Sequence, residues 1–63
     1  MYNREDLLKR LALYKLELSE LYLQLLAVTL LDYKREIDSL NGSIAVLKGR
    51  IKAVEIALST INN

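Results

Sequence analysis

The chain has 63 residues, lacks Cys and His, and carries 9 basic and 8 acidic side chains, for a net charge of +1. The absence of Cys and His excludes disulfides, thiolate chemistry and most zinc or haem sites, so we expect no metal and no cofactor. The balanced charge gives no electrostatic reason for binding nucleic acid or an anionic membrane. A chain this short buries only about 60% of its unfolded surface. Oligomerisation is the remaining way to stabilise it.

Apolar residues make up 52% of the sequence, Leu occurs fifteen times, Pro is absent and Gly occurs only twice. Leu, Glu, Lys and Arg favour helix by intrinsic propensity, whereas Gly and Pro oppose it. The composition therefore predicts an all-α protein with a single helical-hairpin or coiled-coil domain over residues 1–63.

The first predicted helix spans residues 4–40. Asn3 is a suitable N-cap, because its side chain can accept a hydrogen bond from the first turn, and two acids follow at the positive end of the helix dipole. No Pro or Gly then occurs before position 42. A break near Ser19 or Thr29 is an alternative, because both residue types can cap a helix.

Asn41-Gly42-Ser43 is the strongest turn signal in the chain. Asn or Gly can supply the left-handed residue that ends a helix, and Ser can cap the next one. The sequence therefore predicts a helical hairpin: a long helix over residues 4–40, a turn at 41–43 and a shorter helix over residues 44–61.

Apolar residues with a heptad spacing of alternating three and four residues continue through the predicted turn without losing phase. One continuous helix in a parallel coiled coil is therefore an alternative, at a cost of about 2 kcal/mol in helix propensity. We favour the hairpin, because Asn, Gly and Ser together form an efficient turn. The predicted hairpin or coiled-coil seam consists of Leu23, Leu26, Leu30, Tyr33, Ile37, Leu40, Ile44, Leu47, Ile51, Val54, Leu58 and Ile61.

A second apolar row lies on the first half of the long helix and consists of Leu7, Leu11, Tyr14, Leu18, Leu21 and Leu25. A second helix of about 18 residues would cover only the part of the long helix nearest the turn, and each leucine left in water forgoes about 1.5–3 kcal/mol. We therefore expect this row to mediate self-association. A homodimeric antiparallel bundle with a four-helix core is the expected assembly, and a higher oligomer is the alternative.

No catalytic site is predicted. A nucleophile needs a neighbouring base, and neither His nor Cys is present, while the Ser and Thr residues suit helix surfaces and caps. The paired carboxylates Glu17/Glu20 and Glu36/Asp38 lie mostly on the polar face, and no Gly-rich phosphate loop occurs. The chain is therefore expected not to be an enzyme.

The expected function is protein–protein interaction, as an adaptor, assembly factor or inhibitor with an unidentified protein partner. Small Leu-rich chains of this kind are typical of phage and mobile-element accessory proteins. The alternative is a nucleic-acid-binding bundle that uses Lys48, Arg50 and Lys52, provided that they share one continuous face.

The longest charge-free run, Leu21–Leu31, has eleven residues, whereas a membrane-spanning helix needs about 20. The first residues include acids where a signal peptide would be basic. We therefore expect no membrane partner and a cytoplasmic location.

Overall fold

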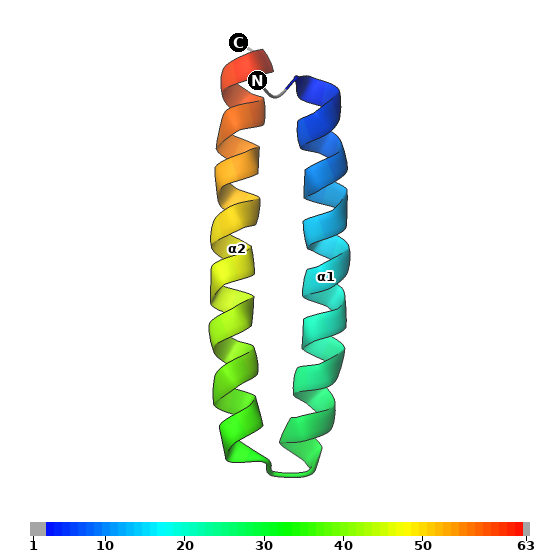
Figure 1. Cartoon of the computed structure of the whole chain (residues 1–63), viewed down its shortest axis with the longest axis vertical. Helices are drawn as coiled ribbons and strands as arrows, with labels where there is room; N and C mark the ends of the chain where they lie inside the picture. Colours follow the sequence, from blue (N-terminus) through cyan, green and yellow to red (C-terminus); the bar gives the residue numbers. More distant parts are fainter. Residues whose placement is uncertain (1–2, 63) are drawn as a thin grey trace.

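The protein is a helical hairpin. The computed structural model describes residues 3–62 and contains α1 (Arg4–Leu30) and α2 (Lys34–Asn62). The two helices run antiparallel and side by side, with the start of α1 and the end of α2 at the same end (Figure 1). The molecule measures 46 × 16 × 14 Å. The predicted all-helical hairpin is confirmed, and the alternative of one continuous helix is wrong.

Helix α1 begins as predicted. The backbone N–H of Asp6 donates to Asn3 Oδ1 at 2.8 Å, so Asn3 is the N-cap. Glu5 and Asp6 lie in the first turn, where the helix dipole favours acids. Lys9 Nζ lies 3.8 Å from Glu5 Oε1 with both side chains exposed, so this pair contributes only a few tenths of a kcal/mol.

The predicted position of the turn is wrong. Asn41-Gly42-Ser43 lies inside α2, and the chain reverses at residues 31–33 instead. The predicted helices 4–40 and 44–61 are therefore replaced by helices of nearly equal length. Asn41, Gly42 and Ser43 are all exposed, and a Cβ added to Gly42 would meet nothing within 4 Å. Their poor helix propensity is offset because α2 packs through its other face.

The turn is built from backbone hydrogen bonds at the end of α1. The N–H of Tyr33 donates to the carbonyl of Val28 at 3.0 Å, and the N–H of Asp32 donates to that of Thr29 at 3.1 Å. This pair of bonds is the Schellman motif, which satisfies carbonyls that the helix end would leave free. The next bond, from the Ile37 N–H to the Tyr33 carbonyl at 2.9 Å, begins α2.

Asp32 is the left-handed residue of this turn, with a φ of 58°, and no other residue in the described part of the chain, glycines included, has a positive φ. Asp and Asn adopt this conformation more readily than other residues with a Cβ, because their short side chains form local hydrogen bonds.

We expect Asp32→Val to lower the free energy of unfolding by about 1–2 kcal/mol, since a β-branched residue is strained at positive φ. Asp32→Gly removes the same carboxylate without that strain and should match or exceed the native stability. Chemical denaturation followed by circular dichroism measures both. Equal losses for Val and Gly would show that the carboxylate, and not the backbone conformation, matters at this position.

The core is a single apolar seam between the two helices. Leu7, Val54 and Leu58 form a buried cluster at the open end, and the partly buried Leu11, Tyr14 and Ala57 pack against it. Spacings of four and three residues continue along both helices, as in an antiparallel coiled coil. The buried or half-buried seam residues are Leu7, Leu11, Tyr14, Leu18, Leu21, Leu25 and Val28 of α1 and Ile37, Leu40, Ile44, Leu47, Ile51, Val54 and Leu58 of α2.

The structure buries or half-buries only part of the predicted seam. Ile37 to Leu58 face α1, whereas Ile61 is 46% exposed. Leu23, Leu26, Leu30 and Tyr33 are all exposed. The α2 spacing, extended backward through residues 31–33, selects residues on the exposed face of α1, because the chain reverses at those residues.

Candidate functional site

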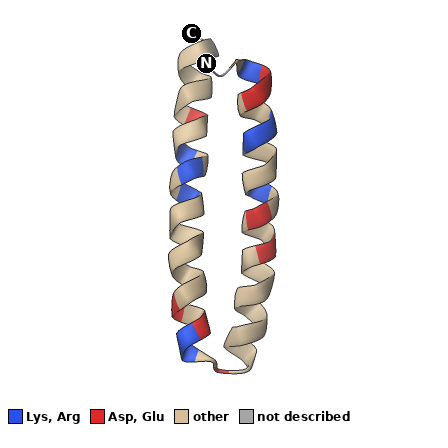
Figure 2. Ribbon diagram, viewed as in Figure 1, with Lys and Arg blue, Asp and Glu red and all other residues tan. Residues whose placement is uncertain are grey.

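The described residues form no cluster of metal-ligating side chains and bury no polar side chain. Within residues 3–62, no group of three or more His, Cys, Asp or Glu is placed to hold a metal ion. No polar or charged side chain is buried in this part of the chain either. Figure 2 shows acids and bases distributed along both helices, with a charge-free stretch in the half of α1 next to the turn. Neither helix is long and apolar enough to cross a membrane.

The row predicted to mediate self-association lies against α2 of the same chain. Leu7 is buried, and Leu11, Tyr14, Leu18, Leu21 and Leu25 are half-buried along the seam. The argument for leaving this row uncovered assumed a second helix of about 18 residues, but α2 has 29 residues and runs the full length of α1 (Figure 1). The surface available to a partner must therefore lie elsewhere.

A different set of leucines is exposed on α1, on the side facing away from α2. Leu16, Leu23 and Leu30 are spaced by seven residues and so lie along one line of the helix. Two more leucines flank this line, one on either side. We name this set the outer leucine row; its side chains are 58–79% exposed, and its members are Leu13, Leu16, Leu23, Leu26 and Leu30.

The hairpin exposes more surface than a compact protein of its mass. Its accessible surface is 4952 Å², whereas a typical monomer of 7.2 kDa exposes about 4,100 Å². Its radius of gyration is 14.4 Å, against about 11 Å for a compact domain of this length. The extra surface includes the outer leucine row, and large exposed apolar patches mark sites of interaction.

The outer side of α2 is different in character. Val46 and Ile56 are exposed there, but they are ten residues apart, and the positions between them are mostly small or polar. A Cβ added at Gly42 or Gly49 would meet nothing within 4 Å, so both glycines face open space. This side offers isolated apolar side chains and not a continuous row.

An open groove runs along one edge of the seam, between α1 and α2. Its lining includes Leu21, Val46 and Leu47 together with the oppositely charged Glu17 and Arg50. Asp38 lines the groove as well, so the lining holds two acids and one base, and Leu21 and Leu47 of its apolar part belong to the seam itself. The groove shows how the helices fit together and carries no cluster of reactive groups.

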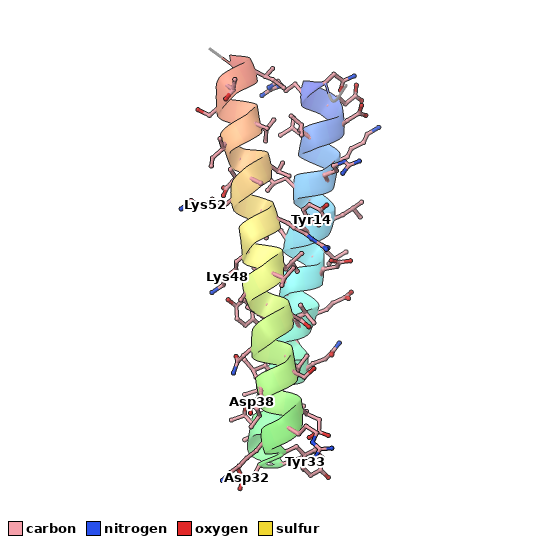
Figure 3. The ribbon with its side chains drawn as sticks, turned by 60° about the vertical axis from the view of Figure 1, so that its left-hand side comes forward. Tyr14, Asp32, Tyr33, Asp38, Lys48 and Lys52 are labelled. Atoms are coloured by element: carbon pink, nitrogen blue, oxygen red, sulfur yellow. The ribbon has the colours of Figure 1, made fainter. Side chains whose placement is uncertain are left out.

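Two residues of the predicted basic cluster, Lys48 and Arg50, lie at opposite edges of the seam. Lys48 Nζ lies 5.6 Å from the centre of the Tyr22 ring, a cation–π contact, whereas Arg50 lines the groove beside Glu17. Glu17 precedes one seam residue and Tyr22 follows another, so they flank α1 on opposite edges. Lys48 and Lys52 project from the same side of α2 (Figure 3).

Sequence reasoning missed the outer leucine row as a distinct surface. The signal was present: the row from Leu7 to Leu25 keeps a heptad phase that also includes Val28, and the phase of the α2 seam differs. A change of phase between residues 28 and 37 marks a chain reversal. The leucines before the reversal that do not keep the phase of the Leu7–Val28 row then lie outside, although most of them share the phase of the α2 seam. Comparison with protein-family models, curated proteins and solved structures finds no match to this chain.

Proposed function

We propose that this chain is a non-enzymatic interaction module, and that the outer leucine row joins it to a second copy of itself. The exposure of five leucines on one side of α1 is the observation that carries the proposal. The seam is already occupied by α2, so the row is free to contact another molecule without opening the hairpin.

The energy available from the row is sufficient for a dimer. Fully burying a leucine contributes about 1.5–3 kcal/mol, and these side chains are already partly covered, so about 1–2 kcal/mol each remains. Ten leucines, five from each copy, then contribute about 10–20 kcal/mol before the cost of association. That cost is about 4–15 kcal/mol, which leaves room for a dimer of micromolar affinity.

The surface areas also favour a dimer. Two separate hairpins expose about 9,900 Å², whereas a compact protein of twice the mass exposes about 6,800 Å². Stable interfaces bury about 1,200–2,000 Å² in total, so the hairpin has ample surface for one. The dimer would present its α2 surfaces to a further protein, in keeping with a role as an adaptor, assembly factor or inhibitor.

Sedimentation equilibrium of the native chain and two matched variants tests the proposal. Leu26 and Ile56 are both 58% exposed, one in the outer leucine row and the other on α2. We expect Leu26→Gln to raise the dimer dissociation constant about 30–700-fold, because each of the two copies loses about 1–2 kcal/mol of interface energy. Ile56→Gln should leave the constant within about twofold of the native value.

Circular dichroism of both variants confirms that the hairpin still folds. A native chain that remains monomeric across the micromolar range contradicts the proposal. Equal effects of Leu26→Gln and Ile56→Gln would place the interface elsewhere. Nucleic-acid binding is not favoured as a second function, because Lys48 and Arg50 lie on opposite edges and do not share one basic face.

A further inference from the structure

We infer that two copies pair antiparallel through the outer leucine row, with Leu23 at the two-fold axis. This inference rests on the proposed self-association and specifies its geometry. The assembly would be a flat row of four helices in the order α2, α1, α1, α2. It differs from a square four-helix bundle, in which each hairpin would pack against the other through one edge of its own α1–α2 seam.

The edges of the seam argue against the square bundle. Positions that flank the seam on either side are largely polar, including Lys15, Glu17, Gln24, Lys48 and Glu55. A square bundle would bury the polar and charged side chains of whichever edge it used, and burying unpaired charge is unfavourable. The outer side of α1 has only Glu20 as a charged residue between Leu13 and Leu30, so it is the better interface.

The position of Leu23 gives the register. Leu23 lies midway between Leu16 and Leu30, and all three lie on one line of α1. In an antiparallel pair centred there, Leu16 contacts Leu30 of the partner, and Leu23 contacts its own copy. The residues beside this line are also complementary in size, because the small Ser19 lies opposite the large Leu26 of the partner. Pairing of large with small residues allows close helix packing.

Charge selects the antiparallel orientation. Lys9 precedes Leu16 by seven residues and therefore lies on the same line as the leucines. A parallel pair would bring the two Lys9 side chains together, and like charges at a helix interface repel. In the antiparallel pair each Lys9 lies beyond the turn of the partner. The two α1 dipoles then also oppose one another, which is the favourable arrangement.

Cysteine crosslinking tests the geometry directly, because the native chain has no Cys. Four single variants are made: Leu16→Cys, Leu23→Cys, Leu30→Cys and, as a control for random collision, Ile56→Cys. Each variant is treated by itself with a short bis-maleimide. A fifth sample, an equimolar mixture of Leu16→Cys and Leu30→Cys, is treated in the same way. Crosslinked dimer is quantified by gel electrophoresis after denaturation.

We expect Leu23→Cys to crosslink with itself at least about tenfold faster than Ile56→Cys, since residues paired in a complex have millimolar effective concentrations. The mixture of Leu16→Cys and Leu30→Cys should crosslink to a similar extent. Leu16→Cys alone and Leu30→Cys alone should stay near the Ile56→Cys background.

The outcomes separate this inference from the proposal beneath it. Self-crosslinking of Leu16→Cys and Leu30→Cys at the rate of Leu23→Cys would show a parallel pair and overturn the inference, while self-association through the outer leucine row would stand. Background rates for every variant and for the mixture would overturn both.

Discussion

Leu47→Ala is expected to lower the free energy of unfolding by about 2–5 kcal/mol, because Leu47 is only 4% exposed and truncation leaves a cavity in the seam. For a domain of this size, each kcal/mol lowers the melting temperature by about 4–8 °C. The midpoint should therefore fall by about 8–40 °C. Thermal and urea denaturation followed by circular dichroism measure the change.

Leu23→Ala is the matched control, since it makes the same truncation at a leucine that is 68% exposed. At concentrations where the hairpin is monomeric, its effect should stay below about 0.5 kcal/mol, as for other surface substitutions. At higher concentrations it should reduce the rise of melting temperature with concentration, because dimerisation stabilises the folded chain by mass action. Equal losses for both variants in the monomer would contradict the assignment of Leu23 to the outside.

Gly42→Pro is expected to destabilise the hairpin by about 3 kcal/mol or more. Gly42 lies in the interior of α2, where Pro removes a backbone hydrogen bond and its ring clashes with the preceding turn. The same substitution would be well tolerated if residues 41–43 formed a turn. Urea denaturation of the variant therefore also distinguishes the two positions of the turn.

Two companion variants make this result specific. Lys34→Pro places Pro at the first position of α2, where its fixed φ suits a helix start, so stability should change by less than about 1 kcal/mol. Gly42→Ala adds a Cβ into open space within a helix and should raise stability by about 0.5–1 kcal/mol. A destabilising Gly42→Ala would indicate that the backbone at this position is not helical.

Local signals predicted several elements of the fold. The composition predicted helix throughout, Asn3 predicted the start of α1, and the spacing from Ile37 to Leu58 predicted the buried face of α2. Each of these depends on residues that are close in sequence. The position of the turn was mispredicted, because intrinsic propensity ranks Asn41-Gly42 above Leu31-Asp32 as a helix end.

Tertiary packing decides between these two positions. A turn at residues 31–33 gives two helices of nearly equal length and matches the seam of α1 from Leu7 to Val28 with that of α2 from Ile37 to Leu58. A turn at 41–43 would leave the start of α1 uncovered. The free energy of burying those leucines exceeds the roughly 2 kcal/mol that Asn, Gly and Ser lose inside a helix.

The candidate interaction surface also depends partly on local sequence and partly on tertiary packing. The sequence by itself determined that the chain has more Leu and Ile than one buried stripe can use, that it is helical, and that the usual metal and nucleophile side chains, His and Cys, are absent. Only the tertiary structure decided which leucines are left outside, because every leucine of α1 has similar neighbours along the chain. The row from Leu7 to Leu25 is covered by α2, and the outer leucine row remains exposed, because antiparallel packing buries one face of each helix and leaves the opposite face in water.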